Sequence, residues 1–126
     1  MPIKKISDFQ GQDGAVFLSA DADGKDLMPE MSLHFMTLTA DTPVTPHVHD
    51  RVEIYIFLSG KAKVMTGDEI KEVSTGDVAM APIGTPHAIQ VLGNEPLMFY
   101  ALNSPPASSC PMEPASDEVI KKFEDA

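Results

Sequence analysis

The chain has 126 residues, of which 43% are hydrophobic and 22% are charged, so it can form one ordinary domain with its own core. This size and composition exclude a two-domain enzyme and a disordered chain. Nineteen acidic side chains against nine basic ones give a formal charge of −10, which argues against nucleic acid and anionic membrane surfaces as partners because both repel a negative protein.

The first 30 residues alternate short apolar pieces with polar, Gly-rich turns, which predicts one or two ragged edge strands. One of these turns carries the acidic cluster Asp21, Asp23 and Asp26. The cluster lacks the spaced carboxylates and the closing Glu of a calcium loop, so we interpret it as a solvated turn.

Seven segments between Met31 and Asn103 combine β-branched, aromatic and other apolar residues, and turn signals separate them. Short segments of this kind are typical of an all-β sandwich or barrel. The clearest hairpin is formed around the turn TGDE, and the stretch DTPVTP is assigned to a turn. The predicted strands cover residues 31–39, 52–60, 61–66, 69–74, 77–82, 87–92 and 97–103.

The segment Ile54–Leu58 is apolar at every position, which predicts a strand that is buried on both faces. One face can point into the interior of a barrel. The other face needs cover from a second sheet or from a partner chain, so we expect a homodimer.

The C-terminal part predicts a helix after an irregular stretch. Residues 104–114 are too rich in proline for regular structure, and Ser116 then caps a short amphipathic helix over 117–125. Residues 1–126 are therefore expected to form one all-β domain with a short C-terminal helix. Cys110, the single cysteine, lies in the Pro-rich stretch and is assigned no role.

The expected location is the cytoplasm. One cysteine cannot form an intramolecular disulfide, and the N-terminal residues lack the apolar core of a secretory signal. No run of about 18 apolar residues occurs, so we expect a soluble protein without a membrane span.

The chain has four histidines, and two of them, His47 and His49, lie two residues apart with Glu53 four residues further on. In an extended segment this spacing puts all three side chains on one face. His87, which opens an apolar strand after a PIGTP turn, is the candidate for a third imidazole. Three imidazoles and one carboxylate suit one divalent ion of iron, manganese, nickel, zinc or copper, with positions left open for water or substrate.

The segments that carry these residues resemble the two motifs of the cupin family. PHVHDRVEIYIFLSG follows the pattern HxHxxxExxxxxxG, and GDVAMAPIGTPH follows the pattern GxxxxxPxGxxH. The resemblance covers about residues 31–103. It implies a small jelly-roll barrel in which His47, His49 and Glu53 of the first motif join His87 of the second around a metal ion. Asp41 and Val91 stand where the family usually has Gly and Asn, and neither position is a presumed ligand.

Three further residues are candidates for catalytic roles in a pocket. Tyr55 shares the parity of Glu53 and should point into the barrel, where its phenol would either orient a substrate or fill volume. Arg51 would clamp a substrate carboxylate if it shared that face, but the turn around it favours a solvent-facing side chain. His34 is expected to be hydrogen-bonded in or beside the core rather than to act as an acid or base in the pocket.

The resemblance implies a fold and a metal site but no single reaction, because this barrel hosts many activities. Our first hypothesis is a metal-dependent enzyme of the dioxygenase, isomerase or lyase type that acts on a small organic molecule at the barrel mouth. The alternative is a non-catalytic module that binds or senses a small molecule. A metal-free structural barrel is the third hypothesis.

Overall fold

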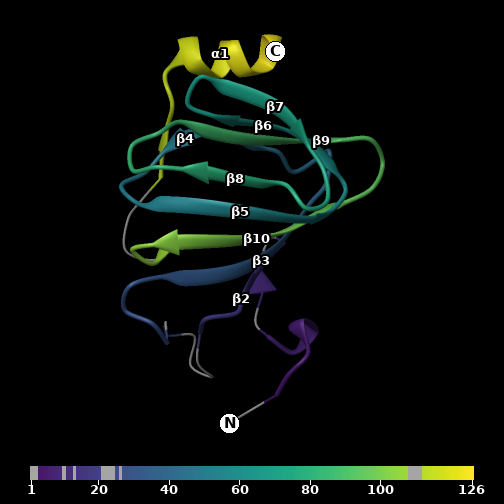
Figure 1. Cartoon of the computed structure of the whole chain (residues 1–126), viewed down its shortest axis with the longest axis vertical. Helices are drawn as coiled ribbons and strands as arrows, with labels where there is room; N and C mark the ends of the chain where they lie inside the picture. Colours follow the sequence, from purple (N-terminus) through teal and green to yellow (C-terminus); the bar gives the residue numbers. More distant parts are fainter. Residues whose placement is uncertain (1–2, 10, 13, 21–24, 26, 108–111) are drawn as a thin grey trace.

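The computed structural model describes residues 3–9, 11–12, 14–20, 25, 27–107 and 112–126. These residues form two antiparallel sheets, with one α-helix at the C-terminus (Figure 1). The predicted all-β fold with a short C-terminal helix is confirmed. The acidic turn around Asp23 and the Pro-rich position of Cys110 lie outside the described residues.

The first sheet has six strands in the order β1-β2-β3-β10-β5-β8, and the second has five in the order β11-β4-β9-β6-β7. In chain order the elements are a 3-10 helix (Ile6–Asp8), β1 (Gly11–Gln12), β2 (Ala15–Phe17), β3 (Ser32–Leu38), β4 (Val44–Val48), β5 (Val52–Ser59), β6 (Lys61–Thr66), β7 (Glu69–Val73), β8 (Val78–Ala81), β9 (His87–Leu92), β10 (Leu97–Ser104), β11 (Glu113–Pro114) and α1 (Asp117–Asp125).

All seven predicted strands are present, but residues 44–46 of the predicted turn DTPVTP instead form the first part of an additional strand, β4. Tertiary pairing overrides that local signal, because β4 pairs with β9 on one side and β11 on the other. The register of β4 shifts between Val44 and His47, where Pro46 lies. Pro46 has no N–H to donate, and its carbonyl accepts a hydrogen bond from the backbone of Ala115 instead.

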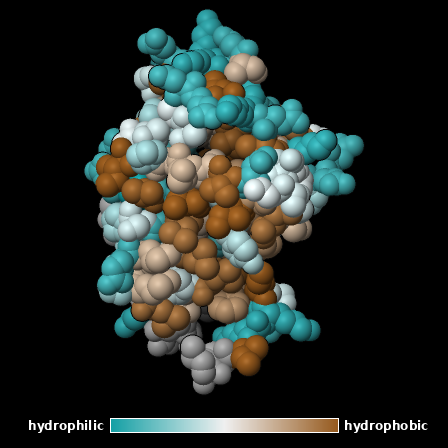
Figure 2. Space-filling view, viewed as in Figure 1, coloured by the Kyte–Doolittle hydropathy of each residue, from teal (hydrophilic) through white to brown (hydrophobic). Residues whose placement is uncertain are grey.

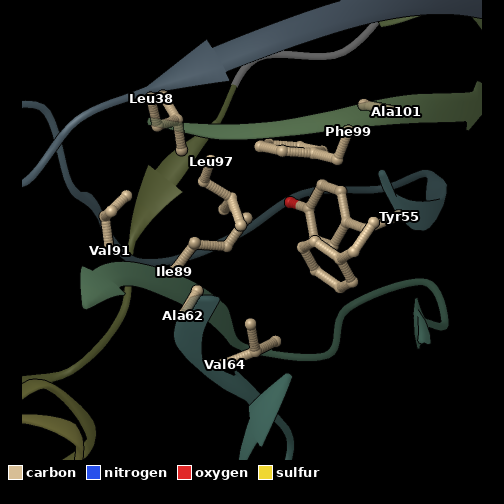
Figure 3. Close-up of a cluster of buried hydrophobic side chains, with 10 residues drawn as sticks. Leu38, Tyr55, Ala62, Val64, Ile89, Val91, Leu97, Phe99 and Ala101 are labelled. Atoms are coloured by element: carbon tan, nitrogen blue, oxygen red, sulfur yellow. The ribbon is translucent and has the colours of Figure 1, made fainter. Parts of the chain in front are cut away.

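The hydrophobic core lies between the two sheets. Figure 3 shows Phe99 and Tyr55 from the first sheet near Ile89 and Val64 from the second. The rings of Tyr55 and Phe99 meet edge to face with centroids 5.3 Å apart. The buried members of this cluster are Leu38, Tyr55, Phe57, Ala62, Val64, Ile89, Val91, Leu97, Phe99 and Ala101.

Helix α1 covers the outer side of the five-stranded sheet. Its Phe123 is buried against Met65 and Ala88, which point away from the core between the sheets. The Ser116 hydroxyl caps the helix by accepting a hydrogen bond from the Val119 backbone N–H, as predicted. The described part of the chain contains no helix with the length and apolarity needed to cross a membrane.

Strand β5 is buried on one face only, so the prediction of burial on both faces is wrong for a single chain. Glu53, Tyr55 and Phe57 point inward and are buried. The alternate residues Ile56 and Leu58 are 37% and 36% exposed. No second layer of the described chain covers this outer side, which explains the difference.

The turn between β5 and β6 requires glycine, and this requirement can be tested. Gly60 has φ +86°, and an added Cβ would lie 2.6 Å from the Pro96 carbonyl oxygen. Gly93 has a similar φ of +77°, with nothing within 4 Å of its Cβ position. We expect Gly60→Ala to lower the free energy of unfolding by about 2–3 kcal/mol and Gly93→Ala by about 1 kcal/mol. Urea unfolding measures both, and equal losses would contradict the steric explanation.

Candidate metal centre

The four presumed ligands come from three strands and one crossing segment. His47 in β4 lies directly opposite His87 in β9, and Glu53 projects inward from β5. His49 lies in the segment 49–51, between the end of β4 and the start of β5. Period-two spacing along one extended segment does not explain how His47 and Glu53 come together, because β4 and β5 belong to different sheets.

The four side chains nevertheless meet. One ligand atom from each of His47, His49, Glu53 and His87 lies within 4.8 Å of all the others, and all four residues are buried. This separation is close to the span of about 4 Å across an ion with ligand bonds of 2.0–2.2 Å. The ring centroids of His47 and His87 are 4.1 Å apart, and those of His49 and His87 are 4.6 Å apart.

Backbone carbonyls fix the orientation of each imidazole. The Nδ1 atoms of His47, His49 and His87 lie 2.8, 3.1 and 2.9 Å from the carbonyl oxygens of Thr45, Arg51 and Thr85 respectively. A carbonyl oxygen can only accept a hydrogen bond, so each Nδ1 carries the hydrogen and donates it. In a neutral ring, Nε2 is then left with a lone pair.

The lone pairs converge on a carboxylate that also only accepts. The Nε2 atoms of His49 and His87 lie 3.0 and 3.1 Å from the Glu53 Oε1 atom. Neutral rings would therefore place acceptors against an acceptor, which is unfavourable unless a cation lies among them. Either protons on the rings or a metal ion can supply that charge, and three nitrogens with one carboxylate oxygen fit a divalent transition metal.

Burial and these contacts determine which groups are charged. Burial is the main reason that the pKa of His47 is lowered from 6.5 to about 4, and the nearby His87 lowers it further. Burial alone would raise the pKa of Glu53, but the Nε2 contacts of His49 and His87, which donate to the carboxylate when those rings are protonated, outweigh it and hold that pKa well below its usual range. A neutral His47 and an ionised Glu53 are the protonation states that bind a metal.

A buried chain of hydrogen bonds holds the other oxygen of Glu53. Asn103, directly across from Glu53 on β10, donates from Nδ2 to Oε2 at 3.2 Å. The Nε atom of Arg51 in turn donates to Asn103 Oδ1 at 2.7 Å. Sequence reasoning missed Asn103, although it shares the inward parity of Ala101 and ends an otherwise apolar strand.

Arg51 is buried, so the favoured solvent-facing orientation is wrong. The crossing segment turns its side chain inward toward Asn103, and its Nη1 also donates to the Ala107 carbonyl at 3.4 Å. Tyr55 is buried as expected. Burial, followed by the charge of Glu53, raises the pKa of the Tyr55 phenol well above its usual value, so the phenol keeps its proton.

A cavity of about 240 Å³ opens beside the cluster and places the remaining candidates. His34 lines it, with its ring edge to face with Phe17 at 4.6 Å between centroids, so His34 is both buried and pocket-lining. The wall of the cavity includes His34, His47, Arg51, Glu53, Tyr55 and Asn103 together with Val44, Ile89, Phe99 and Ala101.

The comparison with protein families finds one match: residues 34–103 fit the model described as the cupin domain. Over 56 residues the chain is 39% identical to an uncharacterized protein of Methanocaldococcus jannaschii. That match covers 44% of this chain and 45% of the relative, so it spans less than half of the relative's length.

Solved structures with the same fold are also found. A cupin 2 domain-containing protein from Halorhodospira halophila superposes with a TM-score of 0.72 at 15% identity, covering 92% of this chain and 78% of the other. A predicted oxalate decarboxylase from Thermotoga maritima superposes with a TM-score of 0.55 at 28% identity, covering 58% of this chain and 64% of the other.

The assigned ligands predict which histidines a bound metal requires. We expect His49→Ala and His87→Ala each to weaken metal binding by at least about 100-fold while the barrel stays folded, because the core lies elsewhere. His34→Ala removes the one histidine outside the cluster and should leave one equivalent of metal bound. Elemental analysis and circular dichroism measure both properties, and one equivalent retained in both cluster variants would contradict the ligand assignment.

The lowered pKa of His47 predicts how stability depends on pH in the metal-free protein. Below pH 6.5 the unfolded chain protonates this side chain, whereas the folded chain does not until about pH 4. The free energy of unfolding should therefore fall by about 2 kcal/mol between pH 7 and pH 5. His47→Gln should flatten this slope in urea unfolding carried out with a chelator. A slope equal to that of the unsubstituted protein would show that His47 does not cause it.

Proposed function

The chain belongs to the cupin family, and we propose from that premise that it is a metal-dependent enzyme acting on a small organic acid in the cavity beside His47, His49, Glu53 and His87. The observation that carries the proposal is the set of imidazole lone pairs directed at Glu53. Such a set has no favourable neutral state of its own, and two of its members, His47 and Glu53, line the wall of a cavity.

The proposed cofactor is one divalent ion of iron, manganese, nickel, zinc or copper, held by the three Nε2 atoms and the Glu53 carboxylate. A bound ion of this kind would supply Lewis-acid chemistry toward a substrate oxygen or, for iron, a site for dioxygen. Asn103 would keep the Glu53 carboxylate oriented toward that ion, because its Nδ2 donates a hydrogen bond to Glu53 Oε2.

An acidic substrate fits the charges and the size of the cavity. The Arg51 side chain lines the cavity together with His47 and Glu53, and its guanidinium is a planar donor suited to a carboxylate. The cation expected at the cluster adds further positive charge, whereas the chain as a whole carries −10. A cavity of about 240 Å³ limits the substrate to a small molecule, with Phe99 and Ile89 facing its apolar part.

Each of the three candidate catalytic residues has a proposed role. Arg51 binds the substrate carboxylate, Tyr55 orients the substrate through its protonated phenol, and His34 serves as an acid or base on the cavity wall. The similarity to the Thermotoga protein, which is described as a predicted oxalate decarboxylase, supports a carboxylate substrate.

The second candidate function is a non-catalytic module that captures a small acid without turnover. The same cavity and the same Arg51 serve it equally well. The metal-free structural barrel is the third candidate. The single-domain organisation of residues 1–126, the cytoplasmic location and the homodimer expected from Ile54–Leu58 also stay predictions.

The test starts from protein purified without added metal or chelator. We expect elemental analysis to find one transition metal, and a panel of small mono- and dicarboxylic acids to include one that is consumed in air with that metal restored. Arg51→Lys should raise KM for this acid by about 10–100-fold, because a lysine cannot replace the planar guanidinium. Lys61→Gln, which removes an exposed cation from the outer side of the other sheet, should leave KM unchanged.

Two outcomes would reject the enzyme. An acid that raises the melting temperature but is never consumed would identify the binding module. Protein that takes up no metal from any of the five ions, yet remains folded, would identify the structural barrel.

A further inference from the structure

The register of the six-stranded sheet arranges its inward side chains in rows that run across the strands. Neighbouring rows are two residues apart along each strand, so the first and third rows are separated by about 14 Å. From first to third, the rows contain Asn103 and Glu53, then His34 and Tyr55, then Met36 and Phe99. All six side chains line the cavity beside the candidate metal centre. Its wall on this sheet therefore changes from polar to apolar along the strands.

The five-stranded sheet has the same order of side chains. The Nε2 atom of His87 lies 3.1 Å from Glu53 Oε1, so His87 faces the first row. Ile89 follows two residues later on β9, and Val44 lies directly opposite it on β4. Val44 packs against the core cluster that contains Ile89 and Phe99, a member of the third row. The cavity therefore has a polar end and an apolar end, and each is built from both sheets.

The two ends suit different parts of one acid. Arg51 donates from Nε to Asn103 Oδ1 at 2.7 Å, so the guanidinium lies at the polar end. Among the described residues that line the cavity, none in the third row has a polar side chain. An acid whose carboxylate contacts Arg51 would place its remote atoms against these apolar residues. A second charged group at that position would lose its hydration without gaining a partner.

The volume of the cavity limits the apolar body of the acid. A cavity of about 150 Å³ between apolar side chains binds benzene, which has six carbons. The cavity of this protein has about 240 Å³, which leaves room for one carboxylate beside a body of that size. Acids with two rings are too large, and acids as short as acetate leave the apolar end unfilled.

Part of the apolar wall comes from outside residues 34–103, the range that fits the cupin domain. Phe17 on β2 lies directly opposite His34 and lines the cavity, and its side chain is 40% exposed. We infer that Phe17 and Met36 determine substrate specificity by binding the apolar body of a monocarboxylic acid of about six carbons, whose carboxylate contacts Arg51. This inference rests on the acid-binding role proposed for the cavity.

Isothermal titration of the full chain with three acids tests the inference. Hexanoate has four more methylene groups than acetate, and adipate has a second carboxylate where hexanoate has its terminal methyl group. Each buried methylene contributes a factor of about four to affinity, so hexanoate should bind at least about 50-fold more tightly than acetate. Adipate should bind at least about 10-fold more weakly than hexanoate, because its second charge meets no partner.

Two variants test the residues that we assign. Met36→Lys should reverse the preference, because a lysine in the third row can pair with the second carboxylate of adipate. We expect adipate to bind about 10-fold more tightly and hexanoate at least about 10-fold more weakly. Phe17→Ala removes apolar contact at a partly exposed position, so it should weaken hexanoate binding about 10-fold and leave acetate binding unchanged.

The matched control is Met80→Lys on the outer side of the same sheet. Figure 2 shows a broad hydrophobic area over the middle of the molecule, and Met80, which lies directly opposite the outward Ile54, is 62% exposed. An apolar acid that bound to the outer surface would be affected by this substitution. Met80→Lys changes the net charge as Met36→Lys does, and it should leave all three affinities unchanged. Circular dichroism should be the same for every variant.

The outcomes separate this inference from the proposed enzyme. Equal affinities for acetate and hexanoate, or tightest binding of adipate, would overturn the inference while the small-acid site stands. Weaker hexanoate binding in Met80→Lys but not in Met36→Lys would also overturn it. The expected order of affinities without turnover of any acid would support the inference and reject the enzyme. A chain that binds none of the three acids would overturn both. The acid series on the unsubstituted chain decides the matter even if Met36→Lys does not fold.

Discussion

The candidate site depends on one hydrogen-bonding constraint: each clustered histidine donates Nδ1–H to a backbone carbonyl two residues away in the chain. The local backbone at Thr45 and Thr85 therefore sets the ring orientation without help from a ligand. Each Nε2 is left as an acceptor, and the neighbouring Glu53 carboxylate is an acceptor as well. These acceptors face one another, so the cluster is stabilised by a positive charge among them, which either a metal ion or protons on the rings can supply.

The fold converts this local constraint into a site by crossing between its two sheets. His47 belongs to one sheet and Glu53 to the other, and the three residues between Val48 and Val52 make the connection. The same crossing carries Arg51 inward, where Asn103 links it to Glu53. A cluster built across two sheets needs both sheets to be packed correctly, so the core between them also positions the ligands.

The strands and the types of the presumed ligands could be predicted from the sequence because both depend on patterns within a few neighbouring residues. Alternation and turn residues locate the seven predicted strands, and the spacing of His47, His49 and Glu53 indicates a candidate metal site. Features that depend on partners distant in the chain could not be predicted. Strand β4 exists because β9 and β11 pair with it, Arg51 is buried because Asn103 accepts its hydrogen bond, and neither partner is visible locally.

The alternation of side chains along β5 explains both the success at the site and the error about burial. Its inward residues Glu53 and Tyr55 line the cavity of the candidate site, while outward residues such as Ile56 are partly open to solvent. From an unbroken apolar run alone, a strand that is covered on both faces by its own chain cannot be distinguished from a strand with one face left uncovered by that chain. Alternate residues of a strand point to opposite faces of the sheet. The outer face of β5 can therefore be apolar without any change to the residues on its inner face. One strand can therefore contribute inward residues to a ligand site and outward residues to a contact surface. A substitution at an outward position need not change the inward residues.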